Sequence, residues 1–233
     1  MPDFSVRIDR TSSDSTKWNK YQDHDVIPFW VADMDFAAPD FVLEALHERI
    51  DHGIIGYAEP RPELVDAACK WFWHRFNWKV DPDWLIWIPG VVPGLNIASR
   101  AIGSDGDALI IMTPVYPPFL SVPENSDKQI LRSPLLYDGA KWIMDFTDIR
   151  DKARLASGLL LSNPQNPTGR VYSENELSKL ANICLANDVV IVSDEIHWGI
   201  VLDEHRSHIP IASISEEFAH TTITLIASTK TYN

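Results

Sequence analysis

Short, largely apolar runs recur along the chain from residue 84 onward, and each is four to six residues long. Within a run, apolar residues stand at successive positions rather than at alternate ones. A strand with this pattern is buried on both faces, as the strands of parallel sheets are. The predicted strands are Trp84–Ile88, Ala108–Met112, Gly158–Leu161, Val189–Val192 and Thr222–Ala227.

Stretches with the spacing of amphipathic helices lie before and between these runs. One of them has Pro39 in its first turn and Gly53 just beyond its end, which is the usual asymmetry of helix ends. Ser173 and Glu176 have the spacing of a capping box at the start of another. Strands that alternate with helices predict an α/β fold with a mostly parallel sheet covered on both faces. The predicted helices are Pro39–Asp51, Pro62–Phe76, Pro93–Ala101 and Glu174–Ala186.

Composition narrows the classes of protein that fit this pattern. The chain of 233 residues carries 20 basic and 33 acidic side chains, a formal net charge of −13. Such a surface repels phosphate backbones and anionic lipids, so we expect neither nucleic acid nor a membrane as partner. Residues 1–5 lack the features of a signal peptide, and Cys69 and Cys184 form no CxxC pair. We therefore expect a cytoplasmic protein.

Polar and aromatic side chains follow the carboxyl ends of the predicted strands. In parallel sheets these ends lie at one edge, where ligands bind. The edge is thus expected to combine a glycine turn, an aromatic ring, a side-chain amide, a carboxylate and an amine. The residues concerned are Gly90, Tyr116, Asn166, Asp194 and Lys230.

The turn at Gly90 has two interpretations. A glycine turn that opens a helix presents free N–H groups to an anion such as phosphate. The pattern Gly90-x-x-x-Gly94 is more often a structural turn, however. It is neither GxGxxG nor a P-loop, which disfavours nucleotide binding of those two kinds.

Two further clusters of polar residues are better explained by a structural role than by a catalytic or metal-binding one. His205-x-x-His208 beside Glu204 has the spacing of metal ligands, but its charged setting predicts a solvated loop, and we expect no metal. Asp33 and Asp35 could form a catalytic carboxylate pair. With a proline shortly after them, they are more typical of turn residues at the entrance to a substrate site.

The strongest motif is Asn163-Pro-Gln-Asn166-Pro-Thr-Gly169. It resembles the NPxNPTG loop of fold-type I enzymes that use pyridoxal 5′-phosphate (PLP). Asp194-Glu-Ile-His197 and Ser228-Thr-Lys-Thr-Tyr-Asn233 stand in the order that this family has. Trp30-Val-Ala-Asp-Met-Asp-Phe36 is similar to the N-terminal signature of the MalY/PatB-type branch, the cystathionine β-lyase-like C–S lyases. The resemblance extends from about residue 28 to the end.

The resemblance implies roles for three of the residues at the sheet edge. Lys230 would hold PLP as a Schiff base and, once released by substrate, move the α-proton. Asp194 would keep the pyridinium nitrogen protonated, and Asn166 would donate to the 3′ oxygen of the cofactor. Considered alone, Lys230 fits a solvated surface lysine, and Asp194 fits a helix cap or a strand-end acceptor.

Five more residues acquire roles in the same way. Tyr116 would stack on the pyridine ring, although a tyrosine here also fits packing in the core or in a dimer interface. The N–H groups of Val91 and Val92 would bind the cofactor phosphate. His197 stands where many aminotransferases have a tyrosine that reaches the 3′ oxygen. Tyr57 would reach the phosphate of a neighbouring subunit, which implies a homodimer with shared active sites.

The chain departs from the family pattern after Lys230. Family members continue with an arginine for the cofactor phosphate, more of the sheet, and a small domain that holds the substrate carboxylate. We therefore expect a three-layer, PLP-dependent transferase-like fold whose C-terminal part is missing. Residues 1–45 would form an N-terminal arm and part of the small domain. Residues 46–233 would form an incomplete PLP-binding large domain.

The implied reaction is β-elimination on a small sulfur amino acid, which releases a thiol, pyruvate and ammonia. A PLP-dependent aminotransferase is the alternative, because both reactions use every residue named above. Only Trp30–Phe36 and His197 favour the lyase. A third possibility is a non-catalytic fragment of the fold that serves as a binding or regulatory module.

Overall fold

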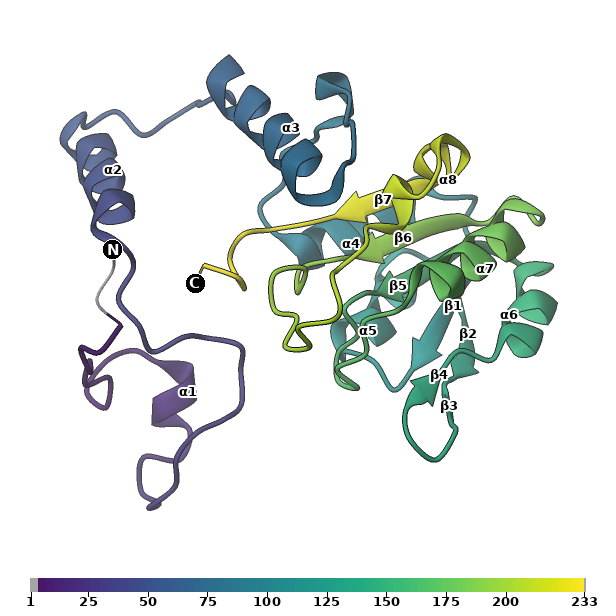
Figure 1. The fold of residues 1–233 in the computed structure, drawn as a ribbon, viewed down its shortest axis with the longest axis horizontal. Helices are drawn as coiled ribbons and strands as arrows, with labels where there is room; N and C mark the ends of the chain where they lie inside the picture. The colour runs from purple at the N-terminus through teal and green to yellow at the C-terminus, as the bar shows by residue number, and fades with distance from the viewer. Residues whose placement is uncertain (1–3, 233) are drawn as a thin grey trace. The chain divides into compact units, whose positions relative to one another are not determined.

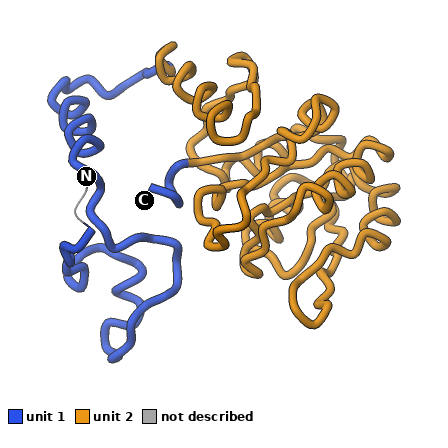
Figure 2. The backbone as a smooth tube through the Cα atoms, viewed as in Figure 1, with its two compact units in different colours: residues 1–59, 228–233 blue, residues 60–227 orange. Residues whose placement is uncertain are grey.

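The structure, a computed structural model, describes residues 4–232 and divides into two compact units (Figure 2). One comprises the chain up to Glu59 together with the residues from Ser228 onward, and the other comprises residues 60–227. The expectations that concern residues 1–3 and Asn233 lie outside the described residues. The domain boundary expected between residues 45 and 46 stays a prediction.

A five-stranded sheet forms the centre of the second unit (Figure 1). Its strands lie in the order β2-β1-β5-β6-β7, and every pair of neighbours is parallel. The fold class predicted from the apolar runs is confirmed, and four of the five predicted strands are present. Their bounds are β1 Ala108–Thr113, β2 Gln129–Pro134, β5 Ala156–Ser162, β6 Val190–Asp194 and β7 Thr222–Leu225.

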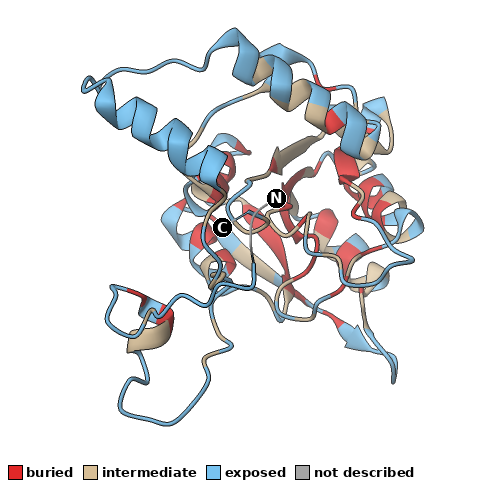
Figure 3. Ribbon diagram, turned by 60° about the vertical axis from the view of Figure 1, so that its left-hand side comes forward, coloured by how far each residue is buried: buried red, intermediate tan, exposed pale blue. Residues whose placement is uncertain are grey.

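Helices cover both faces of this sheet, so the unit has three layers. Successive residues of a strand point to opposite faces, and in β5 Leu159 joins one apolar cluster while Leu160 joins the other. The first cluster includes residues of α7 (Glu174–Leu185) and α6 (Phe146–Ala153). The second includes residues of α4 (Val91–Ala101) and α5 (Pro118–Asn125). Burial on both sides explains the apolar runs of β1, β5 and β6, and Figure 3 shows the buried positions along them.

The capping box predicted at the start of α7 is present. Ser173 Oγ accepts a hydrogen bond from the Glu176 amide at 3.4 Å, and Glu176 Oε2 accepts one from the Ser173 amide at 2.9 Å. The other elements of the unit are α3 Pro62–Phe76, the 3₁₀ helices η1 Pro82–Trp84 and η2 Ile211–Ser213, α8 Glu216–His220, and an antiparallel pair, β3 Leu136–Tyr137 with β4 Trp142–Ile143.

The predicted strand Trp84–Ile88 is wrong. Trp84 ends the 3₁₀ helix η1, and residues 85–88 have no regular structure. A strand needs a partner for its backbone N–H and C=O groups. No strand among the described residues pairs with this segment, and Ile86 is 82% exposed.

The first unit has little regular structure. It contains the short helix α1 (Thr16–Asn19) and the longer α2 (Asp40–Asp51), which confirms the helix predicted there. No residue of α2 is buried, as the exposed colouring of this helix in Figure 3 shows. Within residues 4–232, no helix combines the length and the apolar character that crossing a membrane requires.

Candidate functional site

The strand order of the second unit marks a place for a ligand. β2 lies on one side of β1, and β5, β6 and β7 follow on the other, so the order reverses between β1 and β5. Open α/β sheets bind ligands outside the carboxyl ends of their strands at such a point. Tyr116 follows β1, Asn166 follows β5, and Asp194 ends β6. The structure therefore brings these three predicted site residues to one edge.

Asp194 is a buried carboxyl group at this edge. Its Oδ1 accepts a hydrogen bond from the Ile196 amide at 3.1 Å, and its backbone carbonyl accepts one from the Asn163 amide at 3.0 Å. Among the described residues, no Lys, Arg or His forms an ion pair with it. Burial raises the pKa of Asp194 to about 6, the Ile196 hydrogen bond opposes this, and the neighbouring Glu195 adds to it. A partner that supplies a positive charge or an N–H donor would satisfy this carboxylate.

The loop after β5 is held by its own side chains. Asn163 is fully buried, accepts a hydrogen bond from the Tyr172 amide and donates one to the Ile209 carbonyl, each at 3.3 Å. Gln165 Nε2 donates to the Pro114 carbonyl at 2.6 Å, which joins this loop to the turn after β1. Asn166 donates only its backbone N–H, to Ser162 Oγ at 3.3 Å. Its side-chain amide makes no hydrogen bond within the described chain and is available to a ligand.

The amino end of α4 lies at the same edge. Ile102, just past the other end of this helix, faces Gly158 near the start of β5. Gly90 caps the helix with a φ of 139°, a conformation that favours glycine, and no side chain caps the end. Because Pro93 has no N–H, the amides of Val91 and Val92 are the free donors of the first turn.

Gly94 has a structural explanation. A Cβ atom added there would lie 2.4 Å from Ile88 Cδ1 and 3.0 Å from Leu225 Cδ2. The second glycine of the Gly90-x-x-x-Gly94 pattern therefore permits close packing of α4 against β7. Only the first glycine shapes the free amides.

Tyr116 and His197 lie in the turns beyond two of the strands. Tyr116 is 39% exposed, so it does not belong to the core. His197 is half-buried in the turn after β6, where its carbonyl accepts a hydrogen bond from the Ile200 amide at 2.9 Å. Trp198 follows it, is buried, and donates Nε1 to the Ala227 carbonyl at 3.0 Å.

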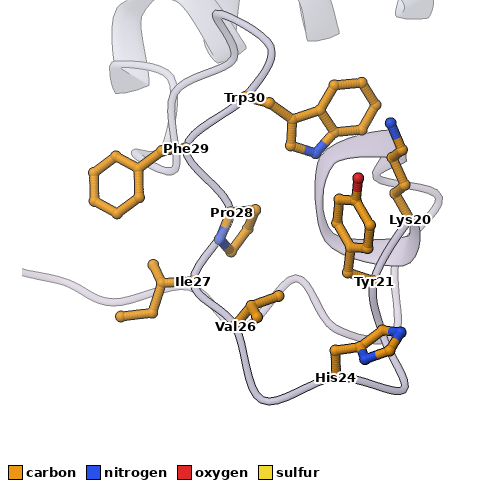
Figure 4. A pocket seen from close by; sticks show the side chains of 8 residues that line it. All are labelled: Lys20, Tyr21, His24, Val26, Ile27, Pro28, Phe29 and Trp30. Atoms are coloured by element: carbon orange, nitrogen blue, oxygen red, sulfur yellow. The ribbon is translucent and has the colours of Figure 1, made fainter.

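Lys230 and Tyr57 belong to the first unit, which is described by itself. Lys230 Nζ donates a hydrogen bond to the Ala32 carbonyl at 2.9 Å, and Tyr57 is fully exposed. A surface cleft of about 660 Å³ also lies in this unit (Figure 4). Its walls include Trp30, whose ring lies under Lys20 Nζ at 4.1 Å. None of the predicted site residues lines this cleft.

The sequence reasoning missed a buried polar pair below the edge. His208 Nε2 lies 2.7 Å from Glu195 Oε2, and both side chains are almost completely buried. Glu195 Oε1 also accepts hydrogen bonds from Ser193 Oγ at 2.8 Å and from the Ile211 amide at 3.3 Å. The predicted solvated loop is correct for His205 but wrong for His208. The apolar neighbours of His208 were the available signal. No cluster of metal ligands occurs among the described residues.

Comparison with known proteins places the chain in a family. Residues 24–231 match the family model of aminotransferase class I and II. The cystathionine β-lyase PatB of Bacillus subtilis is 42% identical over 99% of this chain, and the protein MalY of Escherichia coli is 31% identical over 92%. The matches cover 61% and 57% of those proteins, respectively.

Solved structures agree with this assignment. Cystalysin from Treponema denticola, whose crystal structure contains PLP, is 34% identical and matches all of this chain and 61% of its own with a TM-score of 0.92. The PLP-bound C–S lyase of Staphylococcus hominis is 33% identical, with a TM-score of 0.89 over 99% of this chain and 60% of its own. The chain thus spans about three fifths of its relatives, and the expected fold and resemblance are confirmed. It belongs to the aminotransferase class I and II family.

Proposed function

We propose that this chain binds PLP and that the protein to which it belongs catalyses β-elimination on small sulfur amino acids. The observation that carries the proposal is the buried carboxylate of Asp194 at the carboxyl edge of a parallel sheet, without a cationic partner among the described residues. The similarity to cystathionine β-lyases and to PLP-bound C–S lyases supports the choice of reaction.

The residues at this edge fit the cofactor. PLP carries a ring nitrogen, a phenolic oxygen, a phosphate and an aldehyde. Asp194 is an acceptor for a protonated ring nitrogen, and the free amide of Asn166 is a donor for the oxygen. The unpaired N–H groups of Val91 and Val92 suit the phosphate. The exposed ring of Tyr116 is available to stack. The resemblance assigns to Lys230, of the first unit, the amine that would condense with the aldehyde with loss of water.

The chain's own residues have separate tasks in the proposed reaction. Bound PLP supplies an electron sink for the electron pair left when the α-proton of an amino acid is removed. Asp194 keeps the proton on the ring nitrogen, because a cation next to a buried carboxylate stabilises the ionised pair. Lys230 takes the α-proton once its amine is free. A thiol leaves from Cβ of the substrate. The unsaturated amino acid that results is hydrolysed by water to pyruvate and ammonia.

An aminotransferase is the alternative, since the same residues serve both reactions. The relatives favour the lyase: PatB is 42% identical, whereas the probable aspartate/prephenate aminotransferase of Aquifex aeolicus is 27% identical. His197 adds support, because it stands where many aminotransferases have tyrosine. A non-catalytic fragment fits less well, because Asp194, Asn166 and Lys230 are all retained.

We also infer a homodimer and a cytoplasmic location. Tyr57 is fully exposed, as a side chain that reaches a second copy would be in one chain alone. Cys69 and Cys184 are both free thiols, which accords with a reducing compartment.

The test uses the native-length protein and the variant Lys230→Ala, with Lys141→Ala as the matched control at an exposed position. We expect the wild type and the control to be yellow with PLP after desalting, and Lys230→Ala to be colourless. We expect pyruvate from L-cystathionine without a keto acid. A protein that stays colourless with added PLP would refute cofactor binding, and turnover only with a keto-acid acceptor would support the aminotransferase.

A further inference from the structure

Four charged side chains form a closed cluster in the first unit. Arg10 bridges two carboxylates: Nη2 lies 2.8 Å from Asp33 Oδ2, and Nη1 lies 2.8 Å from Asp35 Oδ1. Lys17 Nζ lies 2.6 Å from Asp35 Oδ2, and Trp18 Nε1 donates to Asp35 Oδ1 at 2.9 Å. The two positive and two negative charges of the cluster balance. Lys17 is buried, which is unusual for a charged lysine side chain. A buried lysine is retained only where partners compensate its lost hydration.

The same cations hold the backbone of this segment. Lys17 Nζ donates to the Asp33 carbonyl at 2.7 Å, and Arg10 Nη1 donates to the Met34 carbonyl at 3.1 Å. Lys17 in turn accepts a hydrogen bond at its carbonyl from Trp30 Nε1 at 3.3 Å. The cluster therefore fixes both the side chains and the main chain of the segment that follows Trp30.

The fixed segment contains a strained turn. Val31 has a φ of 62°, which is unfavourable for a β-branched residue, and the Asp33 amide donates back to the Val31 carbonyl at 2.9 Å. Strain of this kind persists only where the surroundings over-determine it, and it concentrates at functional positions. Here the ion pairs of Asp33 supply the constraint on one side of the turn.

The turn presents one carbonyl to the proposed catalytic lysine. With the Val31 and Asp33 carbonyls taken by other donors, the Ala32 carbonyl accepts from Lys230 Nζ at 2.9 Å. The two residues are 198 positions apart in the chain and lie in the same unit. The strained residue Val31 therefore lies directly before the residue whose carbonyl accepts from Lys230.

We propose that Arg10, Lys17, Asp33 and Asp35 are positioning residues that aim the Ala32 carbonyl at Lys230 and so hold its amine in place whenever that amine is free. A carbonyl that accepts one N–H leaves the amine's remaining bonding directions open for proton transfer. The catalytic consequence rests on the proposed function; the contact itself does not. Asp33 and Asp35 thus act through the loop rather than as reacting carboxylates.

The test compares Asp35→Asn with Asp25→Asn, an exposed aspartate of the same unit. Cofactor-free protein is treated with limiting acetic anhydride, and acetylation of Lys230 is measured by peptide mass spectrometry. Losing the carbonyl acceptor frees the amine, so we expect Lys230 to react about three- to tenfold faster in Asp35→Asn. Exposed Lys141 and the Asp25→Asn protein should react at unchanged rates.

A second variant guards against loss of folding. Arg10→Lys keeps the charge but cannot bridge both carboxylates, so it should also accelerate acetylation of Lys230 while circular dichroism stays native. In the native-length protein we expect Asp35→Asn to lower kcat about tenfold, with KM and PLP affinity little changed.

The outcomes separate the two proposals. Unchanged acetylation of Lys230 in both folded variants would overturn the positioning role, whatever the enzyme does. Faster acetylation in a protein that never binds PLP would support the positioning role and refute the proposed function. A fall in thermal stability alone, without faster acetylation, would reduce the cluster to a structural anchor.

Discussion

At the scale of single residues, Asp194 sets the electrostatics of the candidate site. Its side chain lies at the end of a strand and is screened from water, so its ionised form is destabilised unless a cation arrives. The same burial strengthens the interaction of Asp194 with a protonated ring nitrogen and lowers the stability of the cofactor-free protein. Binding and stability are therefore opposed at this residue.

This opposition predicts a pH dependence. The pKa of Asp194 is raised from 3.8 to about 6. Its contribution to the free energy of unfolding is therefore fully present below about pH 4, where the carboxyl group is protonated in both the folded and the unfolded protein. The contribution is lost as the pH rises through 6 and the buried group ionises. The shift corresponds to at most about 3 kcal/mol. Cofactor-free Asp194→Asn should therefore gain stability relative to wild type between pH 4 and about 7.

Thermal unfolding of both proteins across this range, followed by circular dichroism, measures the difference. Parallel curves for wild type and variant would contradict the burial argument. With PLP present the order should reverse, because the neutral amide of the Asp194→Asn variant lacks the charge that holds the ring nitrogen's proton.

At the scale of elements, the Glu195–His208 pair stabilises the loop between β6 and η2 by hydrogen bonds. Glu195 takes hydrogen bonds from Ser193, His208 and Ile211, so one side chain joins three points of the chain. The phenyl ring of Phe76 meets His208 edge to face at 5.5 Å, which adds the end of α3. These hydrogen bonds hold the residue next to Asp194 in place at the end of β6.

His208→Ala should lower the free energy of unfolding by about 2–4 kcal/mol, because it leaves a buried carboxylate without one partner. His205→Ala, at an exposed position three residues earlier, should change it by less than about 0.5 kcal/mol. Urea unfolding gives both values. Equal midpoints for the two variants would show that the pair contributes nothing.

The elements that could be predicted from sequence are those with local signals. The strands β5 and β6 each contain an uninterrupted apolar run, and α7 carries its own capping box, so each is visible in a short window. The edge strand β2 was missed, because its residues are mostly polar or half-buried. The segment at Trp84–Ile88 was assigned wrongly, because an apolar window does not reveal whether a partner strand exists.

The candidate site residues are predicted for a different reason. Asp194 and Asn166 follow recognisable strands, so their edge could be inferred, and motif resemblance gave their roles. The positioning role proposed for Arg10 and Lys17 could not be inferred from the sequence. Their partners Asp33 and Asp35 lie far along the chain, and only folding brings them together. The burial of His208 is signalled only by the apolar residues that follow it, because charged residues precede it.

At the scale of the whole molecule, the proposed dimer gives Tyr57 a task. If its hydroxyl reaches a phosphate bound by a second copy, Tyr57→Phe should weaken PLP binding about tenfold and leave the dimer mass unchanged. Tyr137→Phe, at another exposed tyrosine, should leave PLP affinity at the wild-type value. Equilibrium dialysis gives the affinities and light scattering the mass. Unchanged affinity in Tyr57→Phe, or a monomer, would contradict the shared site.

The strand order has a consequence for how the chain assembles as it is synthesised. β1 emerges first and pairs with β2, and each later strand then pairs with one already made: β5 with β1, β6 with β5, and β7 with β6. Among these five described strands, none must be inserted between two that are already joined. The sheet can therefore grow in one direction behind the ribosome, and the strand that carries Asp194 has one neighbour in place before it appears.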